Sequence, residues 1–315
     1  MAGTHPGAAG PEPFTHPALF YRDEREYLAG VLPFVTGALD AADPVAVVVP
    51  PDNLALLRAA LGADAGRVVM LDMTEVGRNP GHLIPGVLLA FADRHPGGHV
   101  RIVGEPVWAA RSVHEYPACA RHEALINHAF AGRTVTILCP YHVGSLTPKT
   151  LTDALRTHPL VVDATGRHVS DRYDPDAVVS ACNRPLPPPE GATAVTVETI
   201  GLPALRRVAA RLAARAGLGA ERVEDVALTL TELAGNSIEH GGGTARVLLG
   251  TAGEHLVCQV RDSGRLADPL AGSRPAGPGQ LRGRGLLLVH HLADLVRTYT
   301  GPAGTCVEAS FRLGH

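Results

Sequence analysis

A predicted helix from Ala220 to His240 carries polar side chains at a spacing suited to chemistry. Glu232 and Asn236 are four residues apart, so on a helix their Cβ atoms lie roughly 5–6 Å from each other on one face. Gly235, Asn236 and Ser237 are three consecutive poor helix formers, which together cost roughly 2 kcal/mol relative to alanine. A run of poor helix formers inside an otherwise favourable helix indicates a functional constraint rather than a merely solvated surface.

Apolar residues form a stripe along the same helix, at the rotation of about 100° per residue that an α-helix has. We expect this stripe to face the hydrophobic core. The stripe consists of Val223, Val226, Ala227, Leu230, Ala234 and Ile238. The opposite face, which we expect to point away from the core, consists of Asp225, Thr229, Glu232, Asn236 and Glu239.

The run from Glu232 to His240 resembles the N-box of the GHKL ATPases, which include histidine kinases and anti-sigma-factor serine kinases. Three further boxes of that family follow in order, and the resemblance covers about Ala192 to Leu313. They are Asp262-Ser-Gly264 after a predicted strand, Gly283-Arg-Gly285-Leu286 at the start of a predicted helix, and Gly304-Thr305 before the last strand.

The resemblance implies an ATP and Mg²⁺ site in an α/β sandwich of the GHKL (Bergerat) type. Glu232 would be the catalytic general base on the attacking hydroxyl, and Asn236 the Mg²⁺ ligand, since an amide oxygen suits that hard cation. Asp262 would accept a hydrogen bond from the adenine amino group, with Thr305 supporting it. The implied nucleotide-binding residues are Asn236, His240, Asp262, Gly264, Arg282, Gly283, Arg284, Gly285, Leu286 and Thr305.

Two departures from the family pattern concern the loop after Asp262. Leu266 stands where the D-x-G box usually has a further glycine, which weakens any claim about flexibility of the loop over the nucleotide. Only about twenty residues separate Asp262 from Gly283, so we expect no long helical lid, and this short form resembles the serine-kinase branch. A histidine kinase also needs a phosphoacceptor hairpin before this domain, and the proline-rich stretch 184–191 occupies that place. The serine-kinase branch is therefore favoured over an atypical histidine kinase.

Composition excludes several other functions. Lys149 is the only lysine among 315 residues, and its surroundings fit neither a P-loop nor a pyridoxal Schiff base. The formal net charge of −3, without a basic cluster, argues against direct nucleic-acid binding. No apolar run is long enough for a membrane span, and five cysteines without CxxC spacing fit a cytoplasmic protein with reduced thiols.

The amino-terminal half alternates apolar strands with helices, which predicts a mostly parallel α/β sheet. The expected strands are 45–49, 67–71, 100–103 and 134–139, and the expected helices are 53–61, 84–93 and 121–130. Ligands of such sheets lie beyond the carboxyl ends of the strands.

This half resembles the MEDS sensory domain, a RecA-like module, over about Phe14 to Ala181. The residues that carry the resemblance are His16-Pro-Ala-Leu-Phe-Tyr21, Gly104-Glu105-Pro-Val-Trp108, Glu123-Ala-Leu-Ile-Asn127 and Cys139-Pro-Tyr141, the last followed by His142 where Asp is usual. The candidate sensory pocket consists of His16, Tyr21, Glu105, Trp108, Glu123, Asn127, Tyr141 and His142. An equally good interpretation is that Glu105 caps a loop and that Trp108 is a residue of the hydrophobic core.

The predicted organisation is a disordered tail (1–13), a sensory domain (14–183), a linker (184–191) and a GHKL domain (192–315). The hypothesis is a signal-responsive anti-sigma regulator that binds a sigma factor or an anti-anti-sigma STAS protein and phosphorylates the latter on serine, in response to an unidentified small molecule. The alternatives are a non-catalytic, nucleotide- or ligand-gated binding module, and a metal or haem sensor using His114, Cys119, His122 and His128. The sequence leaves the oligomeric state open, a homodimer included.

Overall fold

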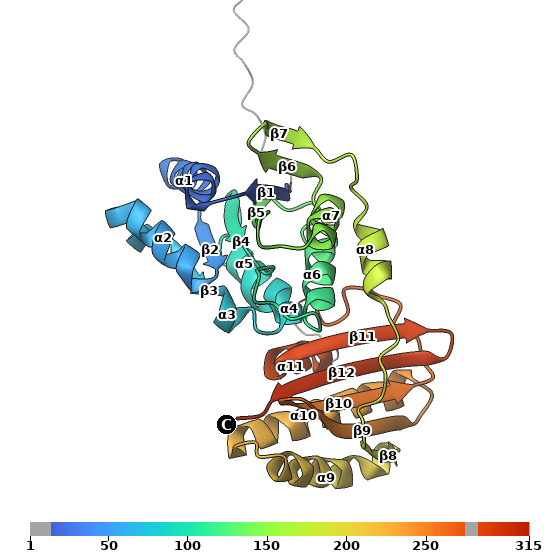
Figure 1. Cartoon of the computed structure of the whole chain (residues 1–315). Helices are drawn as coiled ribbons and strands as arrows, with labels where there is room; N and C mark the ends of the chain where they lie inside the picture. The colour runs from blue at the N-terminus through green and yellow to red at the C-terminus, as the bar shows by residue number, and fades with distance from the viewer. Residues whose placement is uncertain (1–13, 275–282, 315) are drawn as a thin grey trace, which may run out of the picture. The chain divides into compact units, whose positions relative to one another are not determined.

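The computed structural model describes residues 14–274 and 283–314. The chain divides into two compact units, each built around one β-sheet (Figure 1). The first unit takes in the residues up to Thr74 together with Ala90–Ala110 and Ile126–Pro175, and the second takes in Glu75–Leu89, Arg111–Leu125 and the residues from Asp176 onward. The division passes through one continuous helix, α6 (Tyr116–Ala129), which we describe with the first sheet.

The first sheet has seven strands in the order β3-β2-β4-β5-β1-β6-β7. Every pairing is parallel except that of β6 with β7, which confirms the predicted mostly parallel α/β sheet. All five residues of β2 are buried, as expected for a strand covered on both faces. The strands are β1 (Pro17–Tyr21), β2 (Val45–Val49), β3 (Val69–Asp72), β4 (Val100–Gly104), β5 (Val135–His142), β6 (Leu160–Asp163) and β7 (Gly166–Val169).

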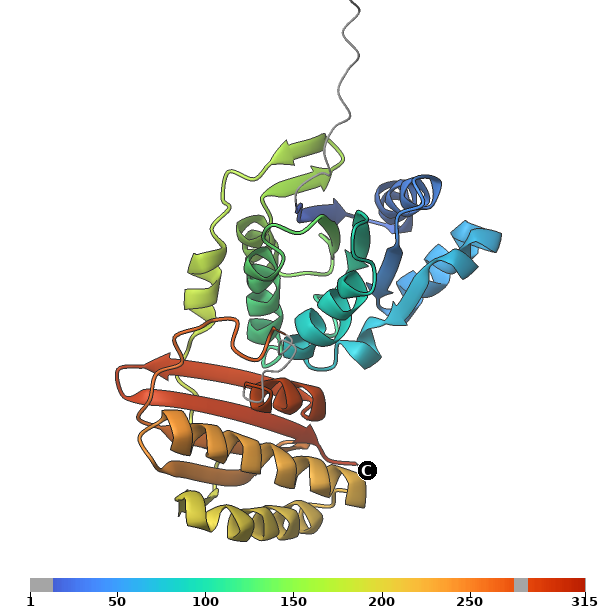
Figure 2. The same cartoon turned by 180° about the vertical axis from the view of Figure 1, so that it is seen from behind.

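Helices connect these strands, as Figure 2 shows from behind. The expected helix 84–93 is instead divided into a π-helical turn, η2, and the short α5, and Pro85 inside η2 cannot donate a backbone hydrogen bond to the helical ladder. The helical segments are α1 (Glu24–Asp40), α2 (Pro51–Leu61), η1 (Gly62–Arg67), α3 (Met73–Val76), α4 (Pro80–His82), η2 (Leu83–Leu89), α5 (Ala90–Asp93), α6, α7 (Pro148–Thr157) and α8 (Pro175–Cys182).

The second sheet is entirely antiparallel, in the order β11-β12-β10-β9-β8. Together with its helices it confirms the predicted α/β sandwich of the carboxyl-terminal half. The strands are β8 (Thr193–Val197), β9 (Ala245–Ala252), β10 (His255–Asp262), β11 (Leu295–Gly301) and β12 (Gly304–Arg312).

The helical segments of this half are η3 (Thr199–Gly201), α9 (Leu202–Arg215), α10 (Ala220–His240) and α11 (Gly285–Leu292), and the three α-helices share one apolar core with the sheet. The buried band of α10 is wider than the predicted stripe. Thr229, expected on the polar face, is fully buried, because α10 packs against α9 and α11 as well as against the sheet. None of the described helices is both long enough and apolar enough to cross a membrane.

The opposite face of this sheet is polar and contacts the proline-rich stretch. Gln259 donates to the carbonyl oxygen of Pro187 at 2.6 Å, and Arg261 donates to that of Leu186 at 2.7 Å. Gln259 also donates to the buried carboxylate of Glu308 at 2.7 Å. Backbone carbonyls of the proline-rich stretch thus satisfy buried donors of the sheet.

Candidate functional site

The end of α10 and the end of β10 hold one carboxylate in a fixed orientation. Asp262, the last residue of β10, accepts a hydrogen bond from the Ser237 hydroxyl at 2.6 Å and from the Gly264 backbone amide at 2.8 Å. One bond reaches each carboxylate oxygen, so the side chain cannot rotate without breaking both. Asp262 therefore presents a fixed hydrogen-bond acceptor.

Glycines make this close approach of the two elements possible. A Cβ on Gly304, whose φ is +121°, would lie 1.9 Å from the carbonyl oxygen of Asp262. A Cβ on Gly264 would lie 2.6 Å from the carbonyl oxygen of His240. Because rigid backbone stands at both points, only glycine fits at these two positions.

The start of α11 lies against the two polar residues of α10. A Cβ on Gly285 would be 2.8 Å from Oε2 of Glu232 and 3.0 Å from Nδ2 of Asn236. Gly283, two residues earlier, has a φ of +88°, which favours glycine. The amino-terminal amides of α11 are thus next to Asn236, and such amides form a natural site for an anionic group.

A cavity of about 450 Å³ opens at this junction. The predicted residues that line it are Asn236, His240, Asp262, Gly264, Gly283, Gly285, Leu286 and Thr305. Glu232 and Arg284 are not among the residues that line it, and Arg282 lies outside the described residues. Sequence reasoning missed the apolar wall, to which Leu233, Leu270, Ala271 and Val307 contribute.

Thr305 fixes the loop that follows Asp262. Its hydroxyl donates to the carbonyl oxygen of Gly264 at 3.0 Å and accepts from the amide of Leu266 at 3.2 Å. Thr305 also pairs in register with Asp262 across β10 and β12. The threonine therefore orders the rim of the cavity beside the carboxylate.

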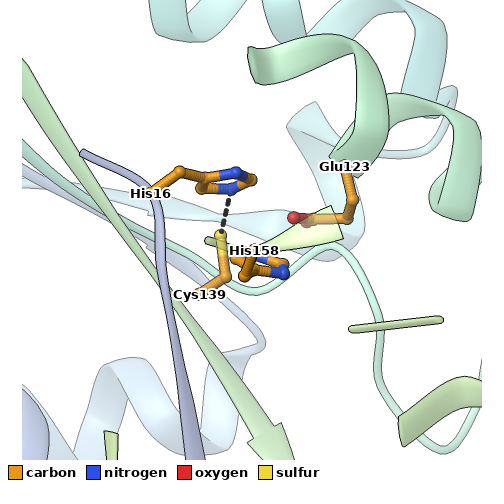
Figure 3. Close-up of side chains that lie close together, drawn as sticks. All are labelled: His16, Glu123, Cys139 and His158. Carbon is orange, nitrogen blue, oxygen red and sulfur yellow. Dashed lines mark hydrogen bonds between the residues drawn. The ribbon is translucent and has the colours of Figure 1, made fainter. Parts of the chain in front are cut away.

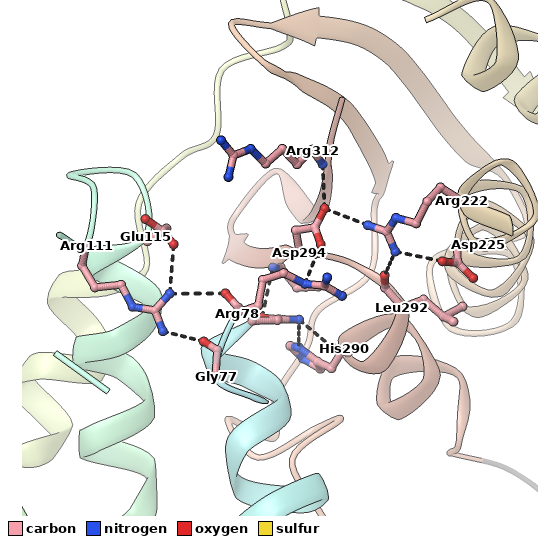
Figure 4. A network of polar contacts seen from close by, with 12 residues as sticks. Gly77, Arg78, Arg111, Glu115, Arg222, Asp225, His290, Leu292, Asp294 and Arg312 are labelled. Carbon is pink, nitrogen blue, oxygen red and sulfur yellow. Dashed lines mark hydrogen bonds and ion pairs between the residues drawn. The ribbon is translucent and has the colours of Figure 1, made fainter. Parts of the chain in front are cut away.

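The far end of α11 is held by a polar network (Figure 4). The buried Asp294 forms ion pairs with Arg78 at 2.6 Å and Arg222 at 2.7 Å. Asn79 donates to the carbonyl oxygen of His290 at 2.8 Å and accepts from the amide of Val296 at 3.4 Å. Arg78 and Asn79 thus bind the end of α11, the start of β11 and the residues between them.

Two histidines near this contact are neutral at physiological pH. Burial lowers the pKa of His290 to about 4, and burial also lowers the pKa of His122 to about 4. Neither imidazole therefore adds charge to the network around α11.

The candidate sensory residues form two groups in the structure. In the first, the buried Glu105 accepts from the Tyr21 hydroxyl at 3.0 Å and from Asn53 Nδ2 at 2.7 Å, and the ring of His142 lies 5.1 Å from that of Tyr21. Burial raises the pKa of the Glu105 carboxyl to about 7. Asn53 was not predicted, because no motif marks it.

In the second group, His16 contacts the side chain of Asn127 at 3.3 Å. His16 and Glu123 lie close to Cys139 and His158, both buried (Figure 3), and the ring of Tyr141 is 5.4 Å from that of His158. His158 was missed, because an isolated histidine after a helix carries no motif.

The other predicted sensory and metal-site residues lie elsewhere. Trp108 is partly exposed in the segment after β4, which fits neither a sealed pocket nor a full core position. Of the four residues of the metal or haem alternative, His114 and His128 are exposed, whereas Cys119 and His122 are buried. Among the described residues, the group of metal-type ligands that come close together is a different one.

Each half of the chain matches the model of a known domain family. The model of the MEDS domain (MEthanogen/methylotroph, DcmR Sensory domain) matches residues 15–159, and that of the histidine kinase-like ATPase domain matches residues 195–311. The chain therefore contains a MEDS domain followed by a histidine kinase-like ATPase domain.

A search of the curated proteins found no match. Among solved structures, the crystal structure of the RsbU and RsbW domains of Rv1364c from Mycobacterium tuberculosis matches with 21% identity and a TM-score of 0.30, over 42% of this chain and 34% of that one. This chain thus spans about a third of the length of that structure.

We predict that Gly285→Ala weakens nucleotide binding by about tenfold or more, because the new Cβ displaces Asn236 and Glu232 from the start of α11. Titration calorimetry with a non-hydrolysable ATP analogue measures the effect. Gly235→Ala on α10 is the matched control, since its Cβ meets nothing within 4 Å. The control should keep its affinity and gain about 0.5–1 kcal/mol of stability. Equal affinities in the two variants would contradict the placement of the site.

We predict that Glu105→Gln flattens the pH dependence of stability in the first unit. Between pH 4.5 and about 7 the folded chain retains a proton on Glu105 that the unfolded chain releases, so stability falls as the pH rises through this window. Across this window the free energy of unfolding falls by a total on the order of 3 kcal/mol. Glutamine does not ionise, so the Glu105→Gln variant avoids this loss. Urea unfolding followed by the fluorescence of Trp108, the single tryptophan, reports it. The exposed Glu24→Gln should retain the wild-type slope, and a wild-type slope in Glu105→Gln would disprove the assignment.

Proposed function

We propose that the chain is a signal-responsive anti-sigma regulator whose ATPase-like domain binds Mg·ATP. In this proposal it holds a sigma factor or an anti-anti-sigma STAS protein, and phosphorylates the latter on a serine. The observation that carries the proposal is the cavity of about 450 Å³ in which Asn236, Asp262 and Gly283 meet. The match of residues 195–311 to the histidine kinase-like ATPase domain supports it.

The lining of the cavity suits an adenine nucleotide. Asp262 is an acceptor that favours an amino group over a carbonyl at the edge of the base, so adenine is preferred to guanine. Leu270 and Val307 provide apolar surface for the base. Phosphates would lie toward the amino terminus of α11, where backbone amides replace the missing P-loop lysine.

Asn236 is the residue suited to hold the metal ion. Its side chain lies beside Gly285, where the amides of α11 begin, so one amide oxygen and the phosphate oxygens would share the cation. Mg²⁺, when bound, neutralises charge on the phosphates.

In this proposal Glu232 acts on the attacking hydroxyl group. It neighbours the amino terminus of α11 and is partly exposed, so the hydroxyl of a docked serine has access to it. In transfer, the Glu232 carboxylate takes the hydroxyl proton while the serine oxygen bonds to the γ-phosphorus and ADP leaves.

Contacts at α11 support gating by the MEDS half. Residues 75–89 belong to the stretch 15–159, and Arg78 and Asn79 within them bond to Asp294 and His290. A change of conformation in residues 75–89 would therefore act directly on the helix whose amino terminus contacts the phosphates.

We predict that Glu232→Gln retains ATP binding within about threefold but loses serine phosphorylation by 100-fold or more, as expected for a general base. Asn236→Ala should lose both, and the exposed Glu221→Gln on the same helix should lose neither. Calorimetry and transfer of labelled phosphate to candidate STAS proteins separate the outcomes. If Glu232→Gln controls the partner as well as the wild type does, while Asn236→Ala does not, the domain is a nucleotide-gated binding module.

We predict that Asn79→Ala loosens α11 and changes ATP affinity about three- to tenfold, because the backbone groups of His290 and Val296 lose their partner, as does the Gly81 amide. Hydrogen exchange of α11 with mass spectrometry, together with calorimetry, measures both effects. Asn183→Ala is the control, since the Asn183 side chain likewise donates to one backbone carbonyl and accepts from one backbone amide of β11, both of Thr300 at the other end of the strand. Unchanged exchange of α11 in Asn79→Ala would remove the gating proposal but leave the kinase proposal intact.

A further inference from the structure

Four buried side chains with metal-binding atoms converge in the amino-terminal half (Figure 3). They are His16 just before β1, Cys139 on β5, His158 after α7, and Glu123 on α6. One ligand atom from each lies within 4.8 Å of every other, and no side chain is more than 1% exposed. The set offers two imidazole nitrogens, one sulfur and one carboxylate oxygen.

The tautomer of His158 can be assigned from its hydrogen bonds. Its Nδ1 lies 2.8 Å from the carbonyl oxygen of Ala154, which only accepts, so Nδ1 carries the proton. Nε2 is therefore the nitrogen with the lone pair, and it is the atom available to a metal ion.

His16 is oriented in the same way through Asn127. The side-chain nitrogen of Asn127 donates to the carbonyl oxygen of Thr157 at 2.8 Å, which identifies its other atom, the oxygen facing His16, as an acceptor. His16 Nδ1 is then the donor, and its Nε2 lies 3.3 Å from Sγ of Cys139. Both histidines thus have Nδ1 engaged by an oxygen and Nε2 as the ligand, which is how metal-binding histidines are usually held.

The charges of the group also suit a dication. Once Cys139 is deprotonated, Glu123 and Cys139 together supply two negative charges, which a divalent ion neutralises. A divalent ion bound by Glu123, Cys139 and two neutral imidazoles gives a site of zero net charge. Bonds of 2.0–2.3 Å in a tetrahedral site place ligand atoms about 3.3–3.7 Å apart, so an inward shift of about 1 Å is enough.

We propose that His16, Glu123, Cys139 and His158 bind one divalent transition-metal ion of the zinc class. On binding, the Sγ–H bond of Cys139 breaks, its proton passes to solvent, and a sulfur–metal bond forms. The mixed nitrogen, sulfur and oxygen ligands favour zinc, or cobalt in its place, over magnesium or calcium. Asn127 and the carbonyl of Ala154 position the two histidines without touching the ion.

The test uses the full chain without a histidine tag, stripped with a chelator and titrated with Co²⁺. We expect about one Co²⁺ per chain, with a thiolate-to-cobalt charge-transfer band in the near ultraviolet and visible bands of tetrahedral intensity. Zn²⁺ should displace the Co²⁺ and abolish both signals. Elemental analysis of protein purified without chelator should find about one zinc per chain.

Cys139→Ala and Cys119→Ala form a matched pair, since each removes one fully buried thiol of this half and only Cys139 belongs to the group. We expect Cys139→Ala to lose the charge-transfer band and Cys119→Ala to retain it. Asn127→Ala, which keeps all four ligands, should retain the band with an affinity about 10- to 100-fold lower. Circular dichroism checks the fold of each variant.

Two results would overturn the proposal. One is the absence of a thiolate band in the wild-type protein with excess Co²⁺; any Co²⁺ that binds without that band would be held by surface histidines. The other is a band that survives in folded Cys139→Ala. If Cys139→Ala does not fold, the wild-type titration and Asn127→Ala still decide.

Discussion

The cavity of the ATPase-like domain depends on the contact between the last turn of α10 and the end of β10. Ser237 and the Gly264 amide hold both oxygens of Asp262, and Gly304 and Gly264 allow the backbones to approach. Had any of these glycines a side chain, the carboxylate and the helix would separate. Thr305 and the loop after Gly264 then take their positions from the same contact. One hydrogen-bonded carboxylate therefore fixes this end of the cavity.

The end of the cavity at α11, where we propose that phosphates bind, depends on a different physical constraint. The chain has one lysine, which is paired with Asp153 on α7, so in this proposal the positive charge for phosphate comes from a metal ion, arginine or backbone amides. Gly285 brings the start of α11 against Asn236, which places an amide oxygen next to the helix amino terminus. Helix α11 is in turn held at its far end by Asp294 and Asn79. The position of this short helix, rather than a charged side chain, thus shapes the end of the cavity beside Asn236.

The sequence was informative where function depends on short spacing. Glu232 and Asn236 come together because one helix carries both, and Asp262 follows a strand whose alternation is plain. The sequence was uninformative where the site is completed by residues that are distant along the chain. Leu270 and Ala271 belong to a glycine- and proline-rich loop without periodicity, yet they line the cavity. Thr229 resembled a surface residue, because the pattern of one helix does not show that two other helices pack on it.

The period of a β-strand explains why the candidate sensory residues form two groups rather than one pocket. Successive side chains of a strand point to opposite faces of the sheet. On β5, Cys139 and Tyr141 therefore share one face, and His142 takes the other, where it meets Tyr21.

The start of β1 obeys the same alternation, since His16 and Tyr21 are five residues apart and so point to opposite faces. A run that reads as one motif in the sequence thus supplies two chemical environments. One face has a buried carboxyl, Glu105, with a pKa near neutrality, and the other has the nitrogen, sulfur and oxygen ligands around Cys139. Strand β5 carries members of both groups, Cys139 and His142, so the two environments are joined by one rigid element.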